Sequence, residues 1–232
     1  MSIDKTIAIA ITSKAGTEKK TVAIENAVIG GWTARNVAAM EHHMKELEAI
    51  GVPRPKTTPI YYRVGATRIN TATDVQAVGG DSSGEVEFVL LKTGGRLLVG
   101  LGSDHTDRKA EVYGITVAKQ MCDKPVAPEF WPFAEVEDHW DQLILRSYIA
   151  NAGREELYQE GPVATMLHPR DLMEKYVGPG KELAEGTLMF GGTLAARGGV
   201  RPAERFTFEI EDPVLKRKIR HSYAIHILPI LG

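Results

Sequence analysis

Hydrophobic and polar residues alternate along much of the chain, and a period of two is typical of β-strands with one buried face. The alternation is clear near both ends, in TIAIAIT and KTVAIENAVIGG and again in RFTFEIEDP and RKIRHSYAIHILPI. Because only a short turn separates the last two segments, we expect them to form an antiparallel pair. We predict further strands at TTPIYYRVG, within VEDHWDQLILRSYI and at GTLMFGGTL.

Helical spacing is confined to a few segments. Residues 34–50 place Met40, His43, Leu47 and Ile50 on one face, three or four positions apart. HPRDLMEKYV predicts a short helix that ends at GPG, and RKAEVYGITVAKQM is expected to be mostly helical. Since strands dominate without a regular βαβ order, we expect an α+β fold, a mainly antiparallel mixed β-sandwich or roll with few short helices.

No linker-like stretch divides the chain. We therefore predict a single domain over residues 1–232, with N-terminal strands and a helix over 1–65 and a β core over 66–232.

The segment SGEVEFVLLKTGGRLLVGLGSDHTDR, residues 83–108, predicts a β-hairpin with the loop Gly94-Gly95. With a two-residue loop, Glu87 pairs with Gly102 and Glu85 pairs with Asp104. Side chains two apart on a strand share a face, so the three carboxylates converge. We expect Gly100 and Gly102 to leave room above them.

Val89, Leu91 and Leu98 share that face, which suggests that the carboxylates are partly buried. Buried carboxylates held together need a cation. Oxygen ligands alone favour Mg²⁺ or Mn²⁺, with Ca²⁺ also possible, and no histidine–cysteine cluster supports zinc. The alternative is an ordinary strand face whose glutamates are solvated.

Composition narrows the range of partners. The formal net charge of the 232 residues is −2, which gives no electrostatic reason to expect nucleic acid or an anionic membrane surface. No apolar run reaches the ~20 residues of a membrane span. The single cysteine, Cys122, excludes an internal disulfide and suits a reducing compartment, so we expect a cytoplasmic protein.

Six segments, taken in order, resemble motifs of the fumarylacetoacetate hydrolase superfamily, with this chain in a divergent bacterial branch. GEVEFVLL resembles its Glu-x-Glu metal strand, and GSDHTDRK resembles the segment that supplies a third metal-binding aspartate. AKQMCDKPVAPEFWP resembles its active-site lysine segment, LYQEGPVATMLHPRDLMEKY its Gln-containing strand and the helix after it, and GTLMFGGTLAARGG its Gly-Thr-Pro loop. Upstream, RNVAAMEHHMKELEAIG resembles its His-x-x-Glu helix.

The resemblance implies a role for each matching residue. Glu85, Glu87 and Asp104 would hold the metal, and Lys119 would lie beside the substrate. His43 and Glu46 would form the acid/base pair that activates water. His42, four residues before Glu46, could take the place of His43.

Other candidates would bind the substrate. The resemblance implies substrate contacts for Arg108 and Thr193. The glycine-rich loop that contains Gly192 could cradle an anion with its amides. Arg63 is a candidate for clamping a carboxylate, with an ordinary surface arginine as the alternative.

At the level of function, the resemblance implies a metal-dependent hydrolase that cleaves a C–C bond in a small oxo-acid or 1,3-dicarbonyl compound, such as an acylpyruvate. Its partner would be a small-molecule carboxylate, and a homodimer is expected. Two positions depart from the family pattern: Lys109 replaces an acid and Leu194 replaces a proline. One alternative that these substitutions suggest is a non-catalytic metal-binding scaffold; another is a related decarboxylase, hydratase or isomerase, because these reactions use the same metal-stabilised enolate.

Overall fold

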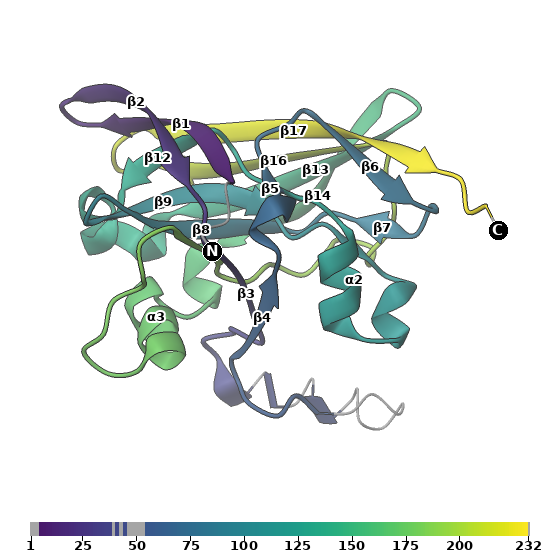
Figure 1. The fold of residues 1–232 in the computed structure, drawn as a ribbon, viewed down its shortest axis with the longest axis horizontal. Helices are drawn as coiled ribbons and strands as arrows, with labels where there is room; N and C mark the ends of the chain where they lie inside the picture. Colours follow the sequence, from purple (N-terminus) through teal and green to yellow (C-terminus); the bar gives the residue numbers. More distant parts are fainter. Residues whose placement is uncertain (1–4, 39, 42–43, 46–53, 232) are drawn as a thin grey trace.

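The computed structural model describes residues 5–38, 40–41, 44–45 and 54–231. Two large β-sheets make up most of it (Figure 1). The larger sheet has the strand order β2 (Gly16–Ala23), β1 (Thr6–Ser13), β12 (Glu129–Pro132), β9 (Arg96–Ser103), β8 (Val86–Thr93), β15 (Thr187–Phe190), β3 (Asn26–Gly31) and β4 (Ile60–Val64). The smaller has the order β14 (Arg154–Pro162), β13 (Ile144–Asn151), β16 (Arg205–Asp212), β17 (Arg217–Leu228) and β6 (Asp74–Val78).

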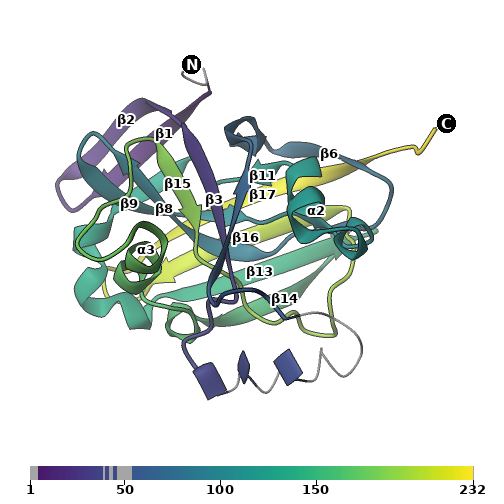
Figure 2. The ribbon, with the colours of Figure 1, turned by 60° about the horizontal axis from the view of Figure 1, so that its bottom comes forward.

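Short elements complete the described part of the chain. Two small strand pairs join β10 (Thr106–Asp107) to β7 (Ser82–Ser83) and β11 (Lys124–Pro125) to β5 (Ile69–Asn70). Two α-helices are described along their whole length, α2 (Ile115–Met121) and α3 (Pro169–Val177), and they lie to either side of β3 in Figure 2. The 3₁₀ helices are η1 (Ala66–Arg68), η2 (Ala110–Val112), η3 (Phe133–Glu135), η4 (Glu137–Gln142) and η5 (Val163–Thr165).

The fold class agrees with the prediction. Most neighbouring strands are antiparallel, as β16 and β17 are, while the pairs β1–β12, β15–β3, β17–β6 and β11–β5 are parallel. One predicted strand is two: KTVAIENAVIGG is divided into β2 and β3. The division occurs because Glu25 and Asn26 donate backbone hydrogen bonds to Gly186, which moves the chain from β1 as its neighbour to β15.

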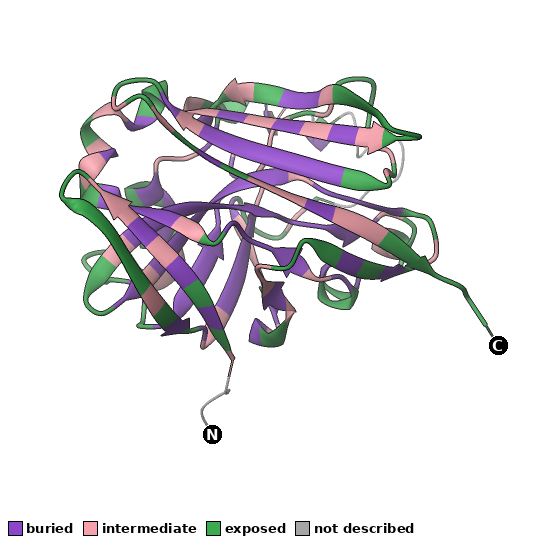
Figure 3. Ribbon diagram, turned by 90° about the horizontal axis from the view of Figure 1, so that it is seen from above, coloured by how far each residue is buried: buried purple, intermediate pink, exposed green. Residues whose placement is uncertain are grey.

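Both faces of the central hairpin β8–β9 are buried, as Figure 3 shows for the inner strands. Phe88 and Leu90 pack in a core shared with Phe208 of the smaller sheet. Val89 and Leu91, on the opposite face, pack in a second core with residues of β1, β3 and β12. Strands distant in the sheet order share this second core, so the larger sheet curves around it. No described helix is long and apolar enough to cross a membrane.

Candidate metal centre

The β8–β9 hairpin has the register that the sequence predicts. Gly94 and Gly95 have φ of 57° and 72°, as a tight two-residue loop requires. Glu87 pairs with Gly102, and one step beyond β8 the amide of Asp104 donates to the carbonyl of Glu85 at 3.0 Å. Both glutamates and Asp104 therefore reach the same end of the hairpin.

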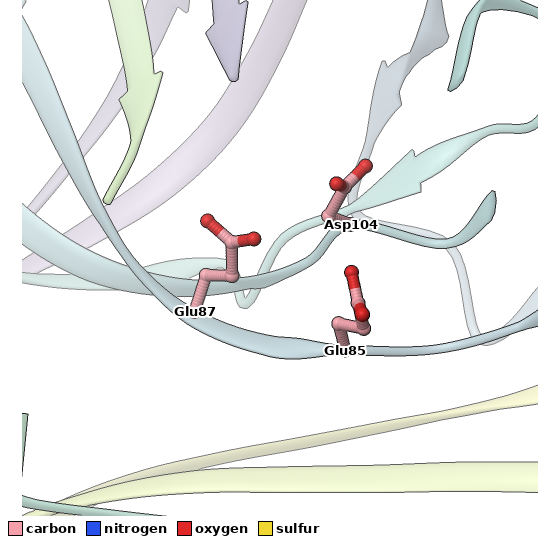
Figure 4. A group of neighbouring side chains, drawn as sticks. All are labelled: Glu85, Glu87 and Asp104. Atoms are coloured by element: carbon pink, nitrogen blue, oxygen red, sulfur yellow. The ribbon is translucent and has the colours of Figure 1, made fainter. Parts of the chain in front are cut away.

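The three carboxylates converge (Figure 4). One oxygen from each of Glu85, Glu87 and Asp104 lies within 4.8 Å of the other two. Glu87 and Asp104 are buried, with 2% and 1% of their surface exposed, and Glu85 is partly buried. The amide of Gly192 donates to Oε2 of Glu87 at 2.7 Å, which fixes this carboxylate against the loop after β15.

Gly100 and Gly102 do not leave empty space above the carboxylates, contrary to the sequence-based expectation. A Cβ on Gly100 would lie 2.6 Å from the ring of Phe130. A Cβ on Gly102 would lie 2.6 Å from the ring of Phe190. Both glycines therefore admit an aromatic ring of the second core instead of a ligand.

Cationic side chains surround the carboxylates. Lys119 of α2 donates to Oδ2 of Asp104. The ammonium of Lys124, which is fully buried, lies 3.1 Å from Oδ1 of Asp104 and also donates to the carbonyl of His105. Arg108 lies 3.2 Å from Glu85 and 3.2 Å from Glu111, and donates to the hydroxyl of Ser83 at 2.7 Å.

These surroundings shift the pKa values of Glu87 and Asp104 in opposite directions. Burial raises the pKa of Glu87 well above its ordinary value, and the nearby Asp104 and Glu85 add to the effect. Burial alone would also raise the pKa of Asp104, but Lys119 and Lys124 outweigh it and hold that pKa below its ordinary value. The same attraction overcomes burial and raises the pKa of Lys119. The site thus favours an ionised Asp104 paired with an ammonium.

The carboxylates line a cavity of about 770 Å³. Lys119, Arg108, Gly192 and Thr193 also line it, so the structure brings these candidates together with the acidic cluster. The hydroxyl of Thr193 donates to the carbonyl of Val86 at 2.8 Å, which ties the loop after β15 to the start of β8.

Arg63 does not line the cavity. Its neighbour Tyr62 does, and successive side chains of a strand point to opposite faces, so Arg63 of β4 is directed away. Its guanidinium donates to Oδ1 of Asn26 at 2.6 Å. Arg63 is exposed, and its role as a substrate ligand stays a prediction.

The predicted acid/base pair, His43 and Glu46, lies outside the described residues, as does the alternative base His42. The described residues among 37–45 are helical, and Met40 of this segment lines the cavity.

Sequence reasoning missed two residues that support the site. Lys124 was passed over because a lysine next to an aspartate and a proline gives no signal of burial. Gln159 lies in the motif LYQEGPV, but no local pattern reveals its contacts. It donates to Thr193 at 2.9 Å and to the carbonyl of Leu194 at 2.6 Å, and it accepts from the amide of Val86 at 3.0 Å.

The donor set fits a hard divalent cation. All three candidate ligands offer carboxylate oxygens, which Mg²⁺ and Mn²⁺ prefer, and they are already gathered in one buried group. Burial, with the negative charges of Asp104 and Glu85 in addition, raises the pKa of Glu87, and a bound divalent ion would favour its ionised form.

Comparison with known sequences identifies a family for this chain. Residues 30–223 match the family described as "Protein of unknown function (DUF2848)". No curated protein matches the chain significantly.

Solved structures show the same fold. A candidate fumarylpyruvate hydrolase from Burkholderia cenocepacia is 18% identical, with 99% of this chain and 96% of that chain covered and a TM-score of 0.64. The 2-hydroxyhepta-2,4-diene-1,7-dioate isomerase from Mycobacterium marinum is 17% identical, with 96% and 99% covered and a TM-score of 0.61. A yeast fumarylacetoacetate hydrolase family protein is 17% identical, with 90% and 96% covered and a TM-score of 0.60. The fold is thus that of fumarylacetoacetate hydrolase proteins, as the sequence motifs indicated.

Proposed function

We propose that this chain, which belongs to the DUF2848 family, is a divalent-metal-dependent hydrolase that cleaves a C–C bond in a small oxo-acid or 1,3-dicarbonyl compound. The observation that carries the proposal is the convergence of Glu85, Glu87 and Asp104, with Lys119 beside them, on the wall of one large cavity. The names of the similar structures add support, because they describe enzymes of small oxo- or hydroxydienoic acids.

The metal proposed for this site is Mg²⁺ or Mn²⁺, held by Glu85, Glu87 and Asp104; Ca²⁺ could occupy the same oxygen donors. When bound, such an ion supplies Lewis-acid stabilisation of negative charge that develops on substrate oxygens. Arg108 would orient Glu85, and the amide of Gly192 would orient Glu87.

Lys119 is the side chain proposed to stabilise negative charge that develops on the substrate. Its pKa is raised, so it carries its positive charge at neutral pH and can stabilise a developing enolate or carboxylate. A proton would be taken from water by His43, oriented by Glu46, or by His42 in its place.

The closest alternative is an isomerase, decarboxylase or hydratase, which would use the same cluster to stabilise an enolate. The isomerase among the similar structures favours this alternative. The two proposals differ in their products: hydrolysis of an acylpyruvate releases pyruvate and a carboxylic acid, whereas isomerisation conserves the mass of the substrate.

The experiment is a screen of acylpyruvates and oxaloacetate with Mg²⁺, with Mn²⁺ and with a chelator. We expect metal-dependent release of pyruvate from an acylpyruvate, detected by a coupled assay and by mass spectrometry. An isomerised product would support the alternative. Release of carbon dioxide from oxaloacetate, without cleavage of any acylpyruvate, would also support it. Turnover that is equal in chelator would contradict both.

The base is tested by two variants. His43→Ala should retain Mn²⁺ binding, measured by calorimetry, and lose at least about a hundredfold in kcat. His42→Ala is the matched control, expected to keep most of the activity. The reverse result would assign the base to His42.

A further inference from the structure

The charged side chains that the described residues contribute to the cavity wall come from one part of the chain. Among the described lining residues, every aspartate, glutamate, lysine and arginine lies between residues 85 and 119. The rest of the wall is neutral and comes mainly from residues 30–34, from β14 and η5, and from the loop after β15. Its apolar members include Trp32, Met40, Met166, Leu194 and Val200.

The charged group has a nearly balanced formal charge. Together with Lys124, which contacts Asp104 but does not line the cavity, it comprises four carboxylates and three cationic side chains: Glu85, Glu87, Asp104 and Glu111 with Arg108, Lys119 and Lys124. The formal sum is −1, and a divalent cation would change it to +1. One carboxylate of a substrate would neutralise this charge, so the cluster has no capacity for a second.

No lysine or arginine lines the neutral wall. Every lysine and arginine of the chain lies among the residues that the structure describes, and only Arg108 and Lys119 line the cavity. Nearby arginines are paired elsewhere: Arg201 binds Glu156 at 2.8 Å, Arg197 binds Glu160 at 2.8 Å, and Arg35 binds Asp141 at 2.7 Å.

Four polar side chains of the neutral wall, those of Gln159, Thr193, Thr165 and Tyr158, are hydrogen-bonded to protein groups. The amide nitrogen of Gln159 donates to Thr193 and to the carbonyl of Leu194. The hydroxyl of Thr165 donates to the carbonyl of Pro162 at 3.0 Å, and that of Tyr158 accepts from the amide of Arg201 at 3.2 Å. A carboxylate placed against this wall would lose its hydration without gaining a charged partner, which is costly.

We infer that the substrate carries one carboxylate, bound at the acidic cluster, and an uncharged, largely apolar group at its other end. The inference rests on the proposed function, because it takes the acidic cluster as the site that binds the oxo-acid. It separates this chain from an enzyme for dicarboxylic acids, whose second carboxylate would need a cation at the far wall.

The test compares binding of matched 2-oxo acids to the Mn²⁺-loaded protein by calorimetry. We expect 2-oxooctanoate to bind at least about tenfold more tightly than 2-oxooctanedioate, which has a carboxylate at its far end. From 2-oxobutanoate to 2-oxohexanoate to 2-oxooctanoate, affinity should rise about two- to fourfold per methylene group. Equal or tighter binding of the diacid, affinity independent of tail length, or no binding of any of the acids would overturn the inference.

A gain of charge at the neutral wall provides a second readout. Ala195 lines the cavity and is exposed, so a long side chain fits there. Ala195→Lys should raise the affinity for 2-oxooctanedioate relative to 2-oxooctanoate by at least about threefold. Ala195→Gln, which has similar bulk and no charge, should leave the ratio as it is. An unchanged ratio in the lysine variant would show that the tail does not reach this wall.

Turnover distinguishes this inference from the proposed function. If the protein prefers 2-oxooctanoate in binding but cleaves no acylpyruvate, the hydrolase proposal fails and the substrate class stands. If it cleaves fumarylpyruvate in preference to hexanoylpyruvate, the hydrolase proposal stands and the inference fails.

Discussion

Glu87 is a buried carboxylate held by a backbone amide, whereas its neighbour Asp104 has two ammonium partners. Because its pKa is raised in the folded protein, ionisation of Glu87 opposes folding as the pH rises above its ordinary range. Metal binding requires the ionised form. Glu87 should therefore lower the stability of the folded protein in chelator and raise it when metal is bound.

Glu87→Gln tests both effects. At pH 8 in chelator the variant should be more stable than the wild type, and at pH 4 the two should be alike, because Glu87 is then protonated. Mn²⁺ at a hundred times its Kd should stabilise the wild type by about 2.7 kcal/mol and leave the variant unchanged. Urea denaturation at both pH values, with and without Mn²⁺, measures this. Undiminished Mn²⁺ stabilisation of the variant would remove Glu87 from the ligand set.

The sequence gives no sign of the role of Lys124, whereas the structure shows its ammonium fully buried beside Asp104. Removing one partner of a buried ion pair leaves the other charge buried and unpaired. Lys124→Met should therefore cost about 3–5 kcal/mol of unfolding free energy. Lys92→Met is the matched control: Lys92 pairs with Glu182, which is 77% exposed, so its loss should cost less than about 1 kcal/mol. Equal losses in urea denaturation would contradict the assigned role of Lys124.

At the scale of elements, the loop after β15 brings Gly192 and Thr193 to the start of β8. Gly192 has φ of 101°, and a Cβ there would lie 1.9 Å from the hydroxyl of Thr33. A side chain would displace the loop and, with it, the amide that holds Glu87.

Gly192→Ala should thus reduce both stability and Mn²⁺ affinity. Gly199→Ala is the control, because Gly199 has φ of 82° but open space around its Cβ position. It should carry only the backbone strain, about 1–2 kcal/mol. Calorimetry should show at least about tenfold weaker Mn²⁺ binding for Gly192→Ala alone. If both variants bind Mn²⁺ as the wild type does, the loop does not position Glu87.

The β16–β17 turn depends on Asp212. Burial alone would raise the pKa of Asp212, but hydrogen bonds from the amide of Leu215, from His139 and from Arg217 outweigh it and lower the pKa. A lowered pKa means that the carboxylate stabilises the fold above its unfolded pKa, and that this stabilisation is lost as the pH falls through the folded value.

Asp212→Asn should therefore cost about 1–3 kcal/mol at pH 7 and much less near pH 2, as measured by urea denaturation across pH. Asp74→Asn is the comparison. Asp74 pairs with His226 in a contact exposed to water, so little change is expected. A loss for Asp212→Asn that is the same at every pH would show that the carboxylate charge is not what stabilises the turn.

Strand register could be predicted, and side-chain surroundings could not. The loop Gly94-Gly95 fixed the pairing of Glu87 with Gly102, because a two-residue turn leaves one register. The partners of Gly100 and Gly102 are Phe130 and Phe190, which are distant in sequence, and no local pattern reveals them. Arg63 shows the same limit. The sequence predicts a strand at TTPIYYRVG but not which of its two faces borders the cavity, and in the structure Tyr62 is on that face and Arg63 is not.

For the whole molecule, two cores stabilise the hairpin from both faces and leave its carboxylate end at the cavity. The order of motifs along the chain was enough to predict this fold, because each motif occupies a fixed strand or loop. The single-domain organisation and the homodimer stay predictions. Light scattering at several concentrations tests the homodimer: a dimeric mass is expected, and a monomeric mass would contradict it.

The central claim is that Glu85, Glu87 and Asp104 together bind one divalent cation. Crystals grown with MnCl₂ and measured near the manganese absorption edge test it directly. The claim predicts an anomalous peak with an oxygen of each of the three carboxylates within about 2.3 Å. Crystals that show no manganese there, with the three side chains turned apart into solvent, would contradict it.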